Sequence, residues 1–163
     1  MKKLLKTFIL AAVLAAVAFT GASAVADETQ KERDERMAWW REARLGMFVH
    51  WGLYSQAAGV WEGRKYWGGV EWIQNSAGIP TDEYEAALRP LFKPKEGFAE
   101  EWAALAKEMG AKYVVFTSKH HEGFALHDSA VTDYDAMDFC GRDLAREIIN
   151  AVRQQDLKVG IYH

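Results

Sequence analysis

The sequence predicts an α/β fold in which parallel strands alternate with helices. Residues 45–51, 113–118 and 159–162 form short apolar segments typical of buried strands, and helical patterns separate them. Each segment also ends in histidine or aromatic residues. Polar groups at the ends of successive parallel strands are how a (β/α)-barrel builds its active site. We therefore expect a partial (β/α)8 TIM-like barrel comprising its first three βα units, since a whole barrel needs about 250 residues.

Before and after the first strand the chain changes character. Residues 27–44 are strongly charged and then acquire Trp39 and Trp40, which predicts a solvated helix that docks through its last turn. Residues 45–51 are apolar on both faces, as in a buried parallel strand. Residues 54–79 are rich in glycine and tryptophan and have no helical period. We expect a long, ordered loop there, of the kind that carries function.

Helical patterns fill the other connections. A short helix is predicted from residue 80, with Thr81 as its N-cap. Residues 99–109 and 143–155 each have an amphipathic period, and Gly110 is placed to end the first of the two. Their apolar faces are Trp102, Leu105, Ala106 and Met109 in the first, and Leu144, Ile148, Ile149 and Val152 in the second.

Strand, helix, strand, helix, strand predicts consecutive parallel pairing with right-handed crossovers. A doubly wound sheet that binds dinucleotides is the alternative topology. It is disfavoured because no G-x-G-x-x-G pattern follows the first strand.

The first 26 residues have the three parts of a secretory signal peptide. Lys2, Lys3 and Lys6 form a basic start, an apolar run follows, and small residues end at Ala26. A membrane anchor is less favoured because the apolar run is short and no basic stop follows it. We expect two parts, a signal peptide at 1–26 and a truncated catalytic domain at 27–163. Cleavage near Ala26 would make the protein periplasmic or extracellular, without a stable membrane anchor.

Charge and cysteine content exclude several classes of site. Residues 1–26 hold three of the 20 basic side chains and none of the 23 acidic ones, so residues 27–163 have a formal charge of −6. No basic stripe is visible, which argues against a nucleic-acid partner. Cys140 is the only cysteine, so neither an intrachain disulfide nor a multi-cysteine zinc site can form.

Three histidines follow the first two predicted strands. His50 ends the first, and His120 and His121 end the second. Metal ligation is disfavoured because adjacent residues on a strand point to opposite faces, and no H-x-H pair follows the first strand. Imidazoles that hydrogen-bond a polyol fit better, since each ring nitrogen can donate or accept. A structural role for any single one of them stays open.

Glu71 and Trp72 lie in the long loop after the first strand. A carboxylate beside an indole can bind a sugar, because the acid accepts from hydroxyls while the ring covers an apolar patch. A surface glutamate beside a core tryptophan is the alternative. Four acids after the second strand are expected to be solvated loop residues, because their spacing does not match a calcium-binding loop. They are Asp128, Asp133, Asp135 and Asp138.

Several motifs in register resemble glycoside hydrolase family 29, the α-L-fucosidases. The resemblance starts in the segment from Met37 to Gly52, MAWWREARLGMFVHWG, and runs to His163. It continues through Glu71-Trp72, residues 79–84, residues 111–113 and the segment KHHEGF at 119–124.

The resemblance implies a (β/α)-barrel catalytic domain that releases terminal α-L-fucose from glycans and glycoconjugates with retention. By motif position, His50, His120 and His121 would hydrogen-bond fucose hydroxyls. Glu71 and Trp72 would line the same pocket, and Tyr162 would complete it. No metal or organic cofactor is implied.

Two departures from the family pattern qualify these expectations. His163 stands where a second tyrosine is common. The nucleophile and the acid/base are expected beyond His163, so the chain alone is expected to be inactive. The alternatives are a non-catalytic sugar-binding remnant and a metal-dependent barrel hydrolase.

Overall fold

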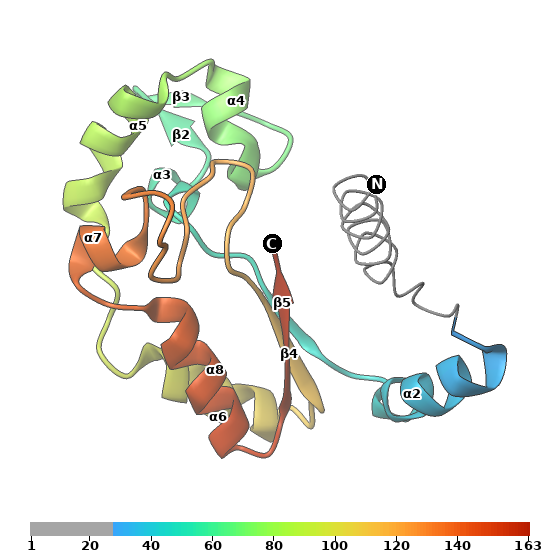
Figure 1. The fold of residues 1–163 in the computed structure, drawn as a ribbon. Coiled ribbons are helices and arrows are strands. Elements are labelled where there is room, and N and C mark those ends of the chain that lie inside the picture. The colour runs from blue at the N-terminus through green and yellow to red at the C-terminus, as the bar shows by residue number, and fades with distance from the viewer. Residues whose placement is uncertain (1–27) are drawn as a thin grey trace, which may run out of the picture. The chain divides into compact units, whose positions relative to one another are not determined.

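The computed structural model describes residues 28–163, so the predicted signal peptide at 1–26 lies outside the described residues. The chain divides into two compact units, Met1–Trp39 and Trp40–His163. The sheet and its helices belong to the second unit (Figure 1). Among the described residues, no helix has the length and hydropathy that a membrane span requires.

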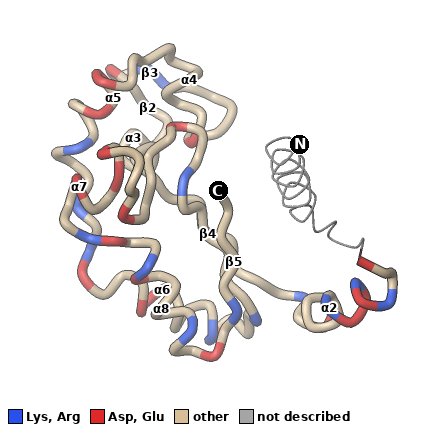
Figure 2. Tube along the Cα trace, in the orientation of Figure 1, with Lys and Arg blue, Asp and Glu red and all other residues tan. Residues whose placement is uncertain are grey.

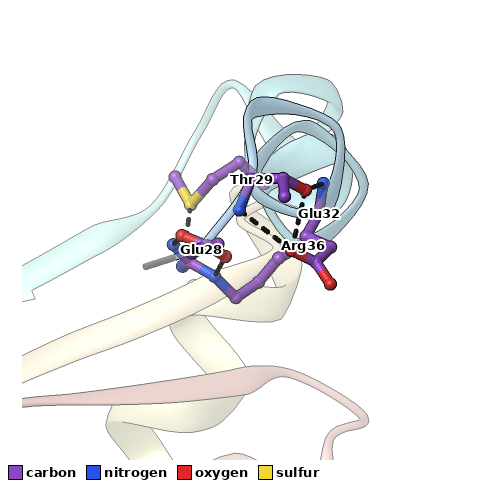
Figure 3. A network of polar contacts seen from close by, with 5 residues as sticks. Glu28, Thr29, Glu32 and Arg36 are labelled. Carbon is purple, nitrogen blue, oxygen red and sulfur yellow. Dashed lines mark hydrogen bonds and ion pairs between the residues drawn. The ribbon is translucent and has the colours of Figure 1, made fainter. Parts of the chain in front are cut away.

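Helix α2 (Gln30–Ala43) is the charged helix that the sequence predicts, and none of its residues is buried. Thr29 and Glu32 cap its start reciprocally: Thr29 N donates to Glu32 Oε2 (2.9 Å), and Glu32 N donates to Thr29 Oγ1 (3.3 Å). Arg36 pairs with Glu28 through two hydrogen bonds of 2.6 and 2.8 Å (Figure 3). Acidic and basic residues are interspersed along this helix (Figure 2), which suits a solvated surface.

Three strands form a parallel sheet in the order β1-β4-β5. They are β1 (Met47–Val49), β4 (Tyr113–Thr117) and β5 (Lys158–Tyr162). Val49 pairs with Phe116, and Phe116 pairs with Ile161, so strands that follow one another across a helical connection are neighbours in the sheet. The predicted α/β fold with consecutive parallel pairing is confirmed.

Helices α6 (Phe98–Glu108) and α8 (Leu144–Gln154) lie side by side against one face of this sheet (Figure 1). The α8 face is largely as predicted, with Leu144, Ile148 and Val152 buried. The α6 face is not. Its buried residues are Phe98, Ala99, Ala103 and Ala106, whereas Leu105 and Met109 are about half exposed. Three of these buried residues are alanines, and hydropathy ranks leucine above alanine, so the sequence pattern identified only Ala106 among them.

The first strand is not buried on both faces as predicted. Phe48 is 55% exposed, while Met47 and Val49 on either side of it pack against the core. The two main helices cover only one face of the sheet, and alternate residues of a strand point to opposite faces. The apolar side chain of Phe48 therefore lies on the face that these helices leave open.

The segment 54–79 is more structured than the predicted loop. Its elements are α3 (Tyr54–Ala57), β2 (Val60–Trp61), β3 (Arg64–Lys65), the 3-10 helix η1 (Val70–Trp72) and α4 (Ile73–Ala77). β2 and β3 pair as a small antiparallel hairpin. Each element is one turn or two residues long, so no period can develop in the sequence.

Helix α5 (Thr81–Leu88) follows, and the 3-10 helix η2 (Arg89–Leu91) continues from it. Thr81 was predicted as the N-cap of α5, and this is wrong. Pro80 occupies the cap position, and the Thr81 hydroxyl accepts a hydrogen bond from Gln74 Nε2 at 3.1 Å instead.

One of the four acids predicted to be solvated is fully buried. Asp135 caps helix α7 (Ala136–Cys140), accepting from Asp138 N at 2.9 Å, and its other oxygen accepts from Ser129 N at 2.9 Å. Asp128, Asp133 and Asp138 are exposed as expected. The prediction failed at Asp135 because a cap is recognised by the helix after it, and α7 is only five residues long.

Candidate active site

The predicted site residues of the strands gather at one edge of the sheet. His50 follows β1 directly, His120 and His121 follow β4 after two intervening residues, and Tyr162 is the last residue of β5. The three strands are parallel and adjacent, so their C-terminal ends meet at this edge. In parallel α/β folds this edge is where ligands bind.

His120 is the centre of a cluster of rings. Its ring centroid lies 5.0 Å from that of His50 and 4.5 Å from that of His121. Tyr162 stacks on it at 5.6 Å with an interplanar angle of 27°. These four side chains come from three strands, so the fold brings together residues up to 112 positions apart in the sequence.

Trp72 and Glu71 join the cluster from the connection between β1 and α5. Trp72, at the end of η1, stacks on His121 with centroids 3.8 Å apart. Beside them lies a pocket of about 290 Å³ lined by Glu71, Trp72, His121 and Glu122, together with residues of α4 and its C-terminal end. His50, His120 and Tyr162 are not in its lining, but they connect to it through the His120–His121 contact. All six predicted residues therefore lie in one region, and their roles stay a prediction.

His120 and His121 are not strand residues, so the predicted alternation of their side chains between opposite faces is wrong. Strand β4 ends at Thr117, so both residues lie in a turn, where their rings come into contact. Gly123 N closes this turn by donating to His120 O at 2.9 Å, and Gly123 has a φ of 80°, a conformation that favours glycine. Among residues 28–163, no group of three or more His, Cys, Asp or Glu side chains is arranged to hold a metal ion.

The electrostatic environment of His120 favours its neutral form. Partial burial lowers the pKa of His120 below the usual histidine value, and the neighbouring His121 and His50 lower it further, while Glu71 acts in the opposite direction. His120 Nδ1 is buried and has no hydrogen-bond partner among the described residues. A neutral imidazole has one ring nitrogen that donates and one that accepts, so it can hydrogen-bond a hydroxyl in either sense.

Two hydroxyl side chains fix the strand ends that carry these rings. Thr117, fully buried, donates to Trp51 O and accepts from Trp51 N, both at 3.0 Å, which sets the backbone next to His50. Ser118 Oγ donates to Tyr162 O at 3.1 Å, beside a backbone hydrogen bond from Ser118 N to the same oxygen at 2.8 Å. Ser118 Oγ lies 3.1 Å from Nδ1 of His163, the residue that departs from the family pattern. Neither Thr117 nor Ser118 was predicted to have a role.

Glu122 is the site residue that the sequence analysis missed. Its side chain is 6% exposed and lines the same pocket as Glu71 and His121. Oε1 accepts from Leu53 N at 2.6 Å, and Oε2 accepts from Tyr54 N at 2.9 Å and from the Tyr84 hydroxyl at 2.8 Å. Burial raises the pKa of Glu122 to about 7, although these hydrogen bonds act to lower it. In the sequence, the only indication of its role was that it is an acid within the motif that contains His120 and His121.

Comparison with known proteins gives a consistent family. Residues 13–163 match the family described as Alpha-L-fucosidase. The chain is 40% identical over 134 residues to the tissue α-L-fucosidase of Rattus norvegicus, which covers 77% of this chain and 29% of the rat protein. The chain therefore spans less than a third of that relative's length.

Solved structures agree with this. A trapped covalent intermediate of a GH29 α-L-fucosidase from Bacteroides thetaiotaomicron matches with a TM-score of 0.74 and 41% identity, over 79% of this chain and 30% of that one. An α-L-fucosidase from Lactobacillus casei in complex with its α-L-fucose product matches with a TM-score of 0.74 and 40% identity, over 78% and 40%. On the extent of these matches, this chain belongs to glycoside hydrolase family 29, the α-L-fucosidases.

Proposed function

We propose that this chain supplies the fucose-binding half of the active site of a retaining α-L-fucosidase. The observation that carries the proposal is the convergence of three imidazoles, an indole and a phenol at the C-terminal edge of three parallel strands. Imidazole and carboxylate groups can hydrogen-bond ring hydroxyls, and the exposed faces of Trp72 and Tyr162 can pack on the apolar parts of a sugar. The substrate in this proposal is a fucosylated oligosaccharide or glycoconjugate.

Each side chain has a role that suits its surroundings. His50 and His121 are exposed and offer ring nitrogens to hydroxyls, and the half-buried His120 contributes a neutral imidazole. Glu71, on the pocket wall, accepts hydrogen bonds from hydroxyls. Trp72 stacks on His121 and so limits the rotation of that ring.

The reacting carboxyl groups are not among these residues in our proposal. Retention requires two carboxyl groups about 5–5.5 Å apart that flank the scissile bond. Both oxygens of Glu122 are engaged by Leu53, Tyr54 and Tyr84, so its carboxyl group is not free for this task. We place the nucleophile and the acid/base on segments that lie beyond His163 in the whole protein.

A closed (β/α)8 barrel is the architecture that we propose for that protein. The open face of the sheet supports it: Phe48 is 55% exposed, Tyr162 is 42% exposed, and their ring centroids lie 6.1 Å apart. In a barrel this face is the interior, filled by side chains of the other strands. We also propose that residues 1–26 direct export to the periplasm or the exterior, in which case N-terminal sequencing of the exported protein should begin near Asp27.

Replacement of His50 by alanine tests the proposed function. In the full-length protein, His50→Ala should reduce kcat/KM for p-nitrophenyl α-L-fucoside by about 100-fold or more, because a hydrogen bond to substrate is lost in the transition state. His127→Ala is the matched control, since His127 contacts His163 rather than the ring cluster. Near wild-type kinetics for His50→Ala would remove this residue from the site.

The alternatives give different results in the same assay. A metal-dependent barrel hydrolase would lose its activity in EDTA, whereas the proposed fucosidase keeps it. A non-catalytic sugar-binding protein would bind L-fucose and release no p-nitrophenol from the fucoside.

A further inference from the structure

We propose that Glu122 is a positioning residue that holds the segment after His50 and the turn of His120 and His121 in a fixed relation. This inference rests on the proposed fucose-binding function and adds to it the group that pre-organises the three imidazoles. Glu122 itself is not placed against the sugar, because its two oxygens already have three protein donors.

The hydrogen bonds of Glu122 cross between segments far apart in the sequence. Leu53 and Tyr54 lie at the start of α3, in the connection after β1, and they are 69 and 68 residues from Glu122. Tyr84 is on α5, 38 residues before Glu122 in the sequence. One buried side chain therefore ties the turn after β4 to the start of the β1 connection and to a helix.

Both segments that Glu122 connects contain site residues within a few positions of its hydrogen-bond contacts. His50 lies three residues before Leu53, and His121 is the residue before Glu122. The Tyr54 ring lies 5.6 Å from the His120 ring, so the segment that Glu122 holds also contacts the central imidazole. A shift of either segment would change the His50–His120 spacing of 5.0 Å.

The packing around Glu122 allows little adjustment. A Cβ built on Gly52 would collide with Glu122 Oε1 and with the Tyr54 ring, so the absence of a side chain at position 52 lets the carboxylate approach the backbone. Leu53, Tyr54 and Tyr84 are each at most 1% exposed. Water cannot readily replace the carboxylate as the acceptor for these buried donors.

The donor pattern explains why a carboxyl group is needed at this position. An ionised carboxylate accepts all three hydrogen bonds. A protonated one can still accept from both N–H groups while it donates to the Tyr84 oxygen. Glutamine presents an NH₂ group in place of one oxygen, so one backbone N–H faces a donor in either orientation of the amide.

Nuclear magnetic resonance and kinetics on Glu122→Gln in the full-length protein test the proposal. The amide protons of Leu53 and Tyr54 should exchange faster, and the nuclear Overhauser effect between the His50 and His120 rings should weaken. The KI of L-fucose should rise by about tenfold or more, since misplaced binding groups lose affinity steeply. Tyr84→Phe keeps both backbone hydrogen bonds and should have a smaller effect on each readout, and Glu122→Asp should partly rescue them.

Leu157→Ala is the control for a loss of stability alone. Leu157 is 6% exposed and precedes β5, at the opposite edge of the sheet from the site. The unfolding temperature of this variant should be lower than that of the wild type. Its KI of L-fucose and the nuclear Overhauser effect between the His50 and His120 rings should be unchanged. All measurements are made well below the unfolding temperature of each variant.

The outcomes separate this inference from the proposed function. If Glu122→Gln loses stability but keeps the wild-type KI and ring–ring effect, Glu122 is only structural and the inference is overturned. If the wild type neither binds L-fucose nor cleaves a fucoside, the proposed function fails. The amide exchange and the ring–ring effect still decide whether Glu122 positions the imidazoles.

Discussion

His120 shows how the fold changes the chemistry of a single residue. Its ring lies among those of His50, His121, Tyr162 and Tyr54. Its Nδ1 atom is buried and has no hydrogen-bond partner among the described residues. Burial and the two neighbouring histidines all disfavour a positive charge on this ring. A neutral His120 suits the recognition of hydroxyl groups, because one of its nitrogens remains an acceptor.

The influence of His50 on His120 can be measured by a pH titration of histidine ring signals. We expect the pKa of His120 to lie below 6.5 in the wild type and to rise in His50→Gln, because one repelling charge is removed. His127→Gln, which removes a histidine outside the cluster, should leave the pKa of His120 unchanged. Equal values in all three proteins would contradict the electrostatic account.

At the scale of elements, the helices differ in how well sequence reasoning identified them. Helix α8 has a clear period and an N-cap at Asp143, whose Oδ1 accepts from Arg146 N at 2.9 Å. The bounds and the main face of α8 agree with the prediction. Helix α7 and the short elements between residues 54 and 77 were missed, because they are five residues long or less and their stability comes from tertiary packing.

Asp135 offers a test of this difference between local pattern and tertiary context. Asp135→Ala should lower the free energy of unfolding by about 2–3 kcal/mol, because two buried N–H groups lose their acceptor. Asp133→Ala is the matched control, an exposed acid two residues away, and should change stability by less than about 0.5 kcal/mol. Urea denaturation of both variants measures the difference, and equal losses would mean that the Asp135 cap contributes nothing specific.

At the scale of the whole molecule, helices cover one face of the sheet and leave the other face open. The C-terminal edge of this sheet carries the candidate site. Val114 and Phe116 are buried on the covered face, whereas Phe48 lies on the open one. The buried acid Glu122 links this edge to α5, outside the sheet. Its ionisation therefore couples the stability of the whole unit to pH.

The pKa of Glu122, raised to about 7 from 4.5, sets the direction of this coupling. Between these values the folded state binds more protons than the unfolded state, so the contribution of Glu122 to stability is greatest below pH 4.5 and is lost as the pH rises through 7. The unfolding free energy of the wild type minus that of Glu122→Gln should therefore fall by about 3 kcal/mol across this interval. Urea denaturation at a series of pH values measures it, and a difference that does not vary with pH would refute the shift.

The sequence by itself determined the order of the three sheet strands and of the longer helices between them, the parallel pairing and the family. These depend on hydrophobic period and on motifs that are contiguous in the chain, as in the segments that hold His50 and His120. Only the tertiary structure decided that Asp135 and Glu122 are buried, that His120 and His121 lie in a turn after the strand, and that α6 packs through its alanines. Burial and hydrogen-bond partners depend on segments tens of residues away, and a local pattern contains no record of them.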